Sequence, residues 1–198
     1  MGITLINSVD IECAVLIHKE AFKHFFLTEL GDSFLSLYYK SVSHNPNGIL
    51  LGCYDDEKML GFCAGTLLSK GFNMDIIKRS FFPFAFIGIK LLFTKPKALL
   101  RLFKNLSKAK ADINDDGHYA ELESIGVTPN CQGKGVGKNL LLALEEEVRR
   151  RGGQKLSLTT DYYNNEKTIS FYNALGYTVW YDFVTYPNRR MYRMIKTL

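Results

Sequence analysis

Three glycines within five residues are the feature that most constrains the fold of this chain. They lie in the segment 132–138, Gln-Gly-Lys-Gly-Val-Gly-Lys. The stretch before it, residues 119–127, alternates between apolar and polar residues as a strand does, and residues 137–151 carry apolar side chains at helical spacing. The sequence therefore predicts a strand that passes through a tight glycine turn directly into a helix.

Such a junction suits a phosphate group. Glycine lets a ligand come close to the backbone, and the first amides of a helix have no acceptor and lie at the positive end of its dipole. Lys134 and Lys138 add positive charge. Two familiar phosphate motifs do not fit, because Asn139 stands where a P-loop needs Ser or Thr, and Gly137 comes one residue early for a dinucleotide fingerprint.

The pattern that fits is Gln/Arg-x-x-Gly-x-Gly/Ala, and on it the chain resembles the GNAT superfamily of acyl-CoA acyltransferases. The segment 120–129, Ala-Glu-Leu-Glu-Ser-Ile-Gly-Val-Thr-Pro, is similar to that family's fourth strand. Residues 165–177 resemble its Asn…Phe-Tyr…Leu-Gly-Tyr segment. The resemblance implies an α+β fold over residues 1–198 as a single domain. Its central, mostly antiparallel sheet would have about six to seven strands, flanked by helices, with a splay between the fourth and fifth strands.

The rest of the chain fits this fold less specifically. The sequence predicts a first strand at residues 3–6, a helix capped by Asp10, a second short helix around Phe34, and a hairpin of residues 48–54 and 59–67.

The resemblance implies acetyl-CoA as cosubstrate and no metal. The pyrophosphate would lie on the loop amides, and the pantetheine would enter the splay. The expected cofactor-binding residues are Ile125, Val127, Gln132, Gly133, Lys134, Gly135, Val136, Gly137, Lys138 and Asn165. For the Asn165 side chain, capping of the following helix is a second interpretation, compatible with the first.

Three residues are candidates for catalysis. Tyr172 stands where the family commonly places a tyrosine that protonates the departing thiolate, although an aromatic residue there could also be core packing. Glu121 and Glu123 lie two apart on one strand and share a face, so either is a candidate base; a solvated strand face is the alternative. Glu121 stands 11 residues before Gln132, the spacing of the base in the histone-acetylating branch of the family.

Residues 70–110 form a basic, phenylalanine-rich insert outside the common core. They hold ten Lys or Arg and one acid, Asp75, a net charge of +9, whereas the whole chain carries +5 and the remainder is therefore at −4. They also hold seven of the 14 phenylalanines. An amphipathic helix is predicted from Pro96. The apolar run 81–93 would span about 20 Å as a helix, too short for a bilayer of roughly 30 Å.

Three interpretations of the insert remain open. It could be a helical lid that packs on the domain or on a second subunit of a homodimer. It could bind an anionic acceptor such as a nucleotide-linked amino sugar, with lysines on the phosphates, as the resemblance to members from polysaccharide pathways implies. It could also contact an anionic membrane that carries a lipid-linked acceptor. Nucleic acid is not an expected partner, because the insert has no known reader motif.

The sequence thus predicts a cytoplasmic acetyltransferase that acts on an amine of a small acceptor by direct transfer in a ternary complex. A protein N-terminal or lysine acetyltransferase and a non-catalytic CoA-binding protein are the alternatives. Cys13, Cys53, Cys63 and Cys131 show no metal-site spacing and are expected to be reduced, buried thiols. The N-terminus shows no signal-peptide pattern.

Overall fold

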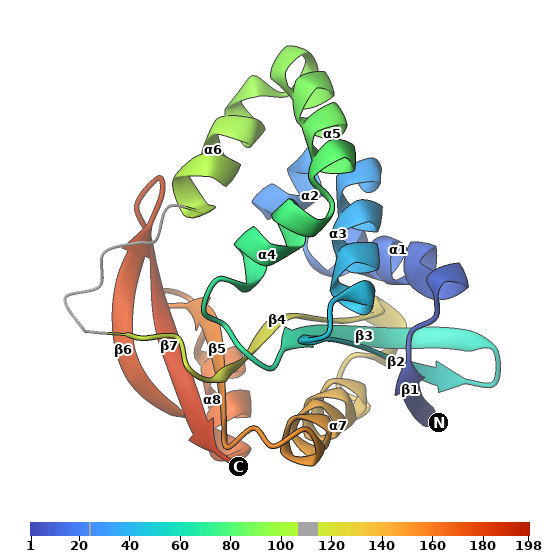
Figure 1. The fold of residues 1–198 in the computed structure, drawn as a ribbon. Helices are drawn as coiled ribbons and strands as arrows, with labels where there is room; N and C mark the ends of the chain where they lie inside the picture. Colours follow the sequence, from blue (N-terminus) through green and yellow to red (C-terminus); the bar gives the residue numbers. More distant parts are fainter. Residues whose placement is uncertain (24, 107–114) are drawn as a thin grey trace.

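The centre of the molecule is a seven-stranded sheet in the order β1-β2-β3-β4-β5-β7-β6 (Figure 1). The computed structural model describes residues 1–23, 25–106 and 115–198. The strands are β1 Gly2–Leu5, β2 Gly48–Asp55, β3 Lys58–Thr66, β4 Ala120–Val127, β5 Lys155–Asp161, β6 Thr178–Thr185 and β7 Arg189–Thr197. Neighbouring strands are antiparallel except β4 and β5, which are parallel. The expected α+β fold with a mostly antiparallel sheet is confirmed.

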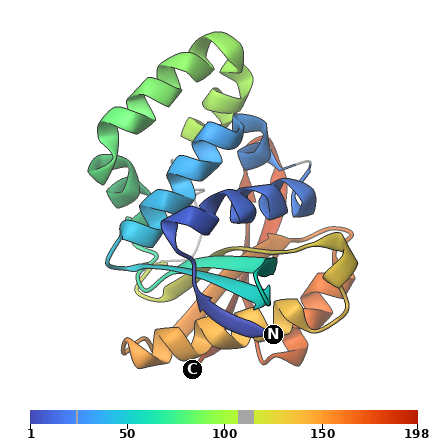
Figure 2. The same ribbon diagram turned by 90° about the vertical axis from the view of Figure 1, so that its right-hand side faces the viewer.

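Helices cover both faces of this sheet (Figures 1 and 2). They are α1 Ile11–Ala21, α2 Phe26–Leu30, α3 Asp32–His44, α4 Phe72–Arg79, α5 Phe81–Thr94, α6 Pro96–Leu106, α7 Val136–Arg150 and α8 Glu166–Ala174, with short 3-10 turns at Ser8–Asp10 and Pro129–Cys131. Helices α7 and α8 lie on one face, α1 and α3 on the other. The apolar residues Leu140, Leu141, Leu144 and Val148 of α7 are fully buried against the sheet, as their helical spacing predicts.

Strands β4 and β5 separate after three paired residues. The pairs are Ala120–Leu156, Glu121–Ser157 and Leu122–Leu158. Both strands continue further, β4 to Val127 and β5 to Asp161, without facing each other. The main-chain groups of β4 that point toward β5 beyond Leu122 therefore have no strand partner among the described residues. This is the expected splay, and it opens toward α1 and the insert.

A bulge interrupts β4 on its other edge. Opposite β3, Ala64 pairs with Ser124 and the next residue, Gly65, pairs with Leu122, so Glu123 is an extra residue with no partner. A bulge bends its strand and redirects the side chain at that point. Glu123 therefore takes a direction that the simple alternation of a strand does not set.

The insert forms three helices rather than the one that Pro96 indicates. Helices α4, α5 and α6 build an arch beside the sheet (Figure 1). The junction of α5 and α6 packs on α2 and α3, where Leu91, Ala98 and Leu99 are buried with Leu30 and Phe34. Within the described part of the chain, no helix is long and apolar enough to cross a membrane. Lys108 and Lys110 lie outside the described residues.

Several local predictions need correction. Helix α2 was not expected, and α3, at 13 residues, is longer than the short helix predicted there. Asp10 occupies the N-cap position of α1, but its carboxylate accepts a hydrogen bond from the Tyr54 hydroxyl (3.2 Å) and not from a helix amide.

The four cysteines are free thiols in two environments. Cys53 and Cys63 are buried in β2 and β3 as expected, and burial raises the pKa of the Cys63 thiol to about 12. Cys13 is exposed and Cys131 is partly exposed, so the expectation of burial was wrong for these two. Cys13 lies on the solvent-facing side of α1. Cys131 lies in the turn before the glycine loop, where the core covers only part of its side chain.

Candidate active site

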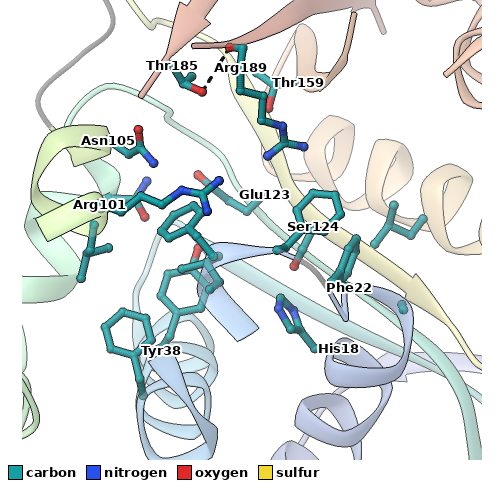
Figure 3. Close-up of a pocket in the computed structure, with 18 of the residues that line it drawn as sticks. His18, Phe22, Tyr38, Arg101, Asn105, Glu123, Ser124, Thr159, Thr185 and Arg189 are labelled. Atoms are coloured by element: carbon teal, nitrogen blue, oxygen red, sulfur yellow. Dashed lines mark hydrogen bonds between the residues drawn. The ribbon is translucent and has the colours of Figure 1, made fainter. Parts of the chain in front are cut away.

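A cavity of about 1300 Å³ lies where the splay, the glycine loop and the insert meet. Its walls come from the second half of β4, the end of β5, helices α1 to α6 and α8, and the turn between β6 and β7. Most of the lining side chains are apolar. Figure 3 shows the polar ones, among them Glu123, Ser124 and His18, pointing into the same space.

The glycine loop has the backbone geometry expected of an anion cradle. Gly133 and Gly135 have φ values of +75° and +83°, in the left-handed region that favours glycine. A Cβ at either position would meet no atom within 4 Å, so the space above the loop is open to a ligand. The amide of Asn139 is the first to bond back to the loop, at 2.9 Å from the Gly135 oxygen. The amides of residues 136–138 therefore have no acceptor within the helix.

The other expected cofactor-binding residues differ in whether they line the cavity. Gln132, Gly133 and Gly137 line the cavity, as do Ile125 and Val127 in the diverging part of β4. Lys134 and Lys138 are exposed beside the loop and do not line the cavity. The Val136 side chain is buried in the core, so that residue can contact a ligand only through its amide.

Asn165 precedes α8, but its side chain does not cap the helix. Its Nδ2 donates to Thr160 Oγ1 at 2.6 Å and to the Asp161 carbonyl oxygen at 3.1 Å. The capping interpretation was therefore wrong for the side chain. These bonds tie the start of α8 to the end of β5, and they fix one wall of the splay where Asn165 lines the cavity.

Tyr172 projects from α8 into the cavity wall. Its side chain is only 6% exposed, and its ring packs against Phe171 and Tyr177, with ring centres at 5.2 and 5.9 Å. No described residue forms a hydrogen bond with its hydroxyl. Burial raises the pKa of Tyr172 to about 12, so the phenol keeps its proton at neutral pH and is available to a ligand in the cavity.

The two candidate carboxylates have different surroundings. Glu121 accepts a hydrogen bond from Arg193 Nη1 at 2.5 Å and another from the Ser69 hydroxyl, and it does not line the cavity. Glu123 does line it. Burial and then the Glu121 carboxylate raise the pKa of Glu123 to about 8, against the opposing charge of Arg193. Glu123 therefore combines a position in the cavity wall with a raised pKa.

A row of buried, hydrogen-bonded polar side chains beside Glu123 was not predicted from the sequence. His18 Nδ1 lies 2.6 Å from the Tyr39 hydroxyl, which lies 3.1 Å from Ser124 Oγ. His18 and Ser124 line the cavity, and His18 Nε2 is buried with no partner among the described residues. Burial lowers the pKa of His18 to about 4, so the imidazole is neutral. These residues are 21 and 85 positions apart, and no local pattern connects them.

Helix α6 and the β6–β7 turn contribute basic and amide groups that the sequence analysis also missed. Arg101 Nε and Asn105 Oδ1 are buried without a partner among the described residues, and both side chains line the cavity (Figure 3). Arg189 lines it as well, held by two hydrogen bonds to Asp161 at 2.5 and 2.7 Å. Arg101 could be found only once the arch was known to face the sheet.

The comparisons with known proteins agree with this geometry. The model of the acetyltransferase (GNAT) family matches residues 16–177, and the chain belongs to that family. Two curated relatives are mycothiol acetyltransferases, from Renibacterium salmoninarum (36% identical) and an Arthrobacter species (39% identical), each over 66 residues. These matches cover 32% of this chain, and the chain spans about a fifth of the length of either relative.

Solved structures share the fold over nearly the whole chain. The ribosomal-protein-S18-alanine N-acetyltransferase of Escherichia coli is 17% identical with a TM-score of 0.62, over 99% of this chain and 92% of that one. An acetyltransferase of Salmonella typhimurium, solved with its cofactor acetyl-CoA, is 16% identical with a TM-score of 0.60, over 100% and 94%. At such identities the likeness concerns the fold, and the expected GNAT fold is confirmed.

Proposed function

We propose that the protein transfers the acetyl group of acetyl-CoA to an amine of a small acceptor. The observation that carries this proposal is the convergence of an open anion cradle, a splayed strand pair, a protonated phenol and a carboxyl group of raised pKa on one cavity. Membership of the acetyltransferase family supports the same reaction. Each of these groups has a separate part in it.

The loop and the splay hold the cosubstrate. The free amides of residues 136–138 and the open backbone at Gly133 and Gly135 suit a pyrophosphate. The unpaired main-chain groups of β4 near Ile125 and Val127 suit the amides of the pantetheine arm, as a strand partner would. This recognition uses main chain, which makes the glycines more important than the neighbouring lysines.

Glu123 and Tyr172 handle the two protons of the reaction. The acceptor must attack as a neutral amine, and Glu123 takes its proton directly or through water as the C–N bond forms. The C–S bond to the acetyl carbon then breaks, and the Tyr172 hydroxyl gives a proton to the leaving thiolate. The products are the acetylated amine and free CoA thiol. Proton exchange with water restores the carboxylate and the phenol.

The cavity favours an acceptor with a large apolar part. Phe22, Phe25, Phe84 and Leu102 line it, whereas no lysine of the described insert does. The interpretation in which insert lysines hold phosphates inside the cavity therefore has little support. A nucleotide-linked amino sugar would depend on Arg101 and Asn105 for its polar contacts, and it remains the anionic candidate to test.

Release of CoA thiol from acetyl-CoA, followed against a panel of amines, tests the proposal. The panel includes apolar amines, amino sugars, nucleotide-linked amino sugars, polyamines and peptides with free N-termini or lysines. We expect at least one non-peptide amine to give turnover that Y172F and E123Q each lower about 100-fold or more. Turnover with peptides alone would instead indicate a protein acetyltransferase. Cosubstrate binding without turnover on any amine would indicate a non-catalytic CoA-binding protein.

A further inference from the structure

Helix α5 exposes more apolar surface than a helix packed on its own domain should. Phe82, Phe86 and Phe93 are 83%, 75% and 81% exposed. Spacings of four and seven residues place them on one side of the helix, together with Ile89, which is also exposed. On the opposite side Leu91 is buried in the cluster that anchors the arch. Apart from the contact of the Phe82 ring with Phe81 and the place of Ile89 at the cavity, the stripe adds little to the packing of the described chain.

The surroundings of this stripe are basic. Lys90 is exposed four residues after Phe86 and three before Phe93, so it lies beside the stripe on α5. Lys78 and Lys97 are exposed on the adjoining helices α4 and α6. The one acid of the insert, Asp75, is already paired with Arg79 at 2.7 Å and accepts a hydrogen bond from Asn45 at 2.8 Å. No ion pair among the described residues involves Lys90 or Lys97, so the positive charge that they give this face is uncompensated there.

We propose that the outer face of α5 docks on an anionic membrane surface. A helix with exposed phenylalanines and flanking lysines inserts its apolar side between lipid headgroups while its cations contact the anionic lipids. At 14 residues α5 is suited to lie along the interface. A second copy of this chain fits less well, because a two-fold contact would bring two uncompensated basic faces together.

The docking face adjoins the candidate active site. Phe81, Ala85, Ile89 and Leu92 of the same helix line the cavity, so α5 is both a wall of the cavity and the surface that meets the bilayer. This part of the inference rests on the proposed function: an amine attached to a lipid would reach the cavity along α5 without leaving the interface. The largely apolar cavity lining agrees with such an acceptor.

Co-sedimentation of the full chain with vesicles tests the docking. The probes are vesicles of phosphatidylcholine with roughly one third phosphatidylglycerol, and vesicles of phosphatidylcholine alone. We expect binding to the mixed vesicles at low salt and its loss at ~1 M salt, where charges are screened within about 3 Å. The variant F82S/F86S/F93S should bind more than tenfold more weakly. In K90Q/K97Q each lost charge should weaken binding roughly fivefold.

A control removes exposed apolar side chains from another face. Val9, in the 3-10 turn Ser8–Asp10, and Leu16, in α1, are 83% and 59% exposed. The variant V9S/L16S should bind vesicles as the unmodified protein does. Since the three phenylalanines do not line the cavity, the triple variant should keep its acetyl-CoA-dependent thermal shift, which shows that it is folded.

The proposal is overturned if the protein does not bind mixed vesicles at low salt, or if the triple variant binds them as well as the unmodified protein. A dimer that forms without lipid and dissociates in the triple variant would also overturn it, in favour of a second copy. The two proposals can fail separately. If the protein does not bind vesicles, release of CoA thiol can still be measured, and if no amine gives thiol release, vesicle binding can still be measured.

Discussion

The sheet and the insert use apolar residues in opposite ways. In the sheet and α7, the apolar residues of α7 and of the central strands are buried, and the chain outside residues 70–110 carries a net charge of −4. In the insert, a net charge of +9 over residues 70–110 surrounds phenylalanines that stay exposed. Burial builds a rigid support for the cosubstrate, while exposure supplies a surface for a partner. The cavity lies at the border between the two regions.

The two regions also differ in what recognises a ligand. The sheet side offers main chain, namely loop amides and the unpaired edge of β4. The insert offers side chains, such as Arg101 and the apolar residues of α5. Main-chain recognition depends on backbone conformation, so the strongest single substitutions should lie at the glycines of the loop.

The largest effect is expected for G135E. Its side chain would project into the open space above the loop, and its carboxylate would repel a pyrophosphate, so the acetyl-CoA-dependent thermal shift should disappear. Gly152, at the other end of α7, is the matched control because it also has a positive φ (+86°) and free space around a Cβ. Both variants should lose about 1–2 kcal/mol of stability from backbone strain. An equal thermal shift in G135E and G152E would contradict the role of the loop.

Y172F should lower kcat by about 10²- to 10⁴-fold with little change in the affinity for acetyl-CoA, because it removes only the proton donor. Steady-state thiol release with the best amine of the panel measures both parameters. The control is Y177F, since the Tyr177 hydroxyl donates to buried Glu145 at 3.0 Å outside the reaction. Y177F should reduce the thermal midpoint and leave kcat as it is. A Y172F enzyme with full kcat would remove Tyr172 from the mechanism.

E123Q should lower kcat and change the pH profile. In the unmodified enzyme Glu123 acts as a base only when ionised, so its kcat/KM should rise with pH through an inflection near 8. E121Q tests the other carboxylate: it breaks the ion pair with Arg193, so it should destabilise the protein. Because the Glu121 charge contributes to the raised pKa of Glu123, the inflection should persist in E121Q but move to lower pH. Persistence of the inflection in E123Q and its loss in E121Q would transfer the role to Glu121.

The raised pKa of Glu123 also has a consequence for stability. The folded protein holds a proton that the unfolded chain releases above about pH 4.3, so the unmodified protein loses stability as the pH rises from there toward 8. E123Q lacks this titration. Its gain in thermal midpoint over the unmodified protein should therefore be larger at pH 8 than at pH 6, and a gain independent of pH would show that Glu123 has an ordinary pKa.

The smallest effect is expected for N165A. Without the bonds to Thr160 and Asp161, the wall of the splay is less firmly held, and KM for acetyl-CoA should rise a few-fold at nearly constant kcat. N173A, on the same helix, is the control with no such bond through its side chain. If N165A changes kcat and leaves KM alone, Asn165 acts on the reaction and not on the cosubstrate.

Local patterns were sufficient for the strand, loop and helix around the glycines. Alternation, glycine spacing and the apolar face of α7 are each set by residues close together in the sequence. The distinction between Glu121 and Glu123 was not accessible in this way, since strand alternation places both on one face. It depends on the β4 bulge opposite Ala64 and on Arg193, which binds Glu121 from a position 72 residues further along the chain.

The insert was predicted least well for a related reason. Its composition showed that it is basic and rich in phenylalanine. Apolar residues occur all along it, however, so the sequence alone does not show which of them are buried. Which phenylalanines pack and which remain exposed depends on the contacts of Leu91 and Leu99 with α2 and α3. Those contacts join segments that are more than about 50 residues apart in the sequence.

Amide hydrogen exchange with and without acetyl-CoA is the most direct test of whether the glycine loop and the diverging part of β4 bind the cosubstrate. The amides of Val136, Gly137 and Lys138 have no acceptor in the helix and should exchange quickly in the free protein. Acetyl-CoA should slow their exchange, together with that of the β4 amides beyond Leu122, and should leave the exchange of the α5 amides unchanged. Unaltered exchange at residues 136–138 under saturating acetyl-CoA would contradict this binding role.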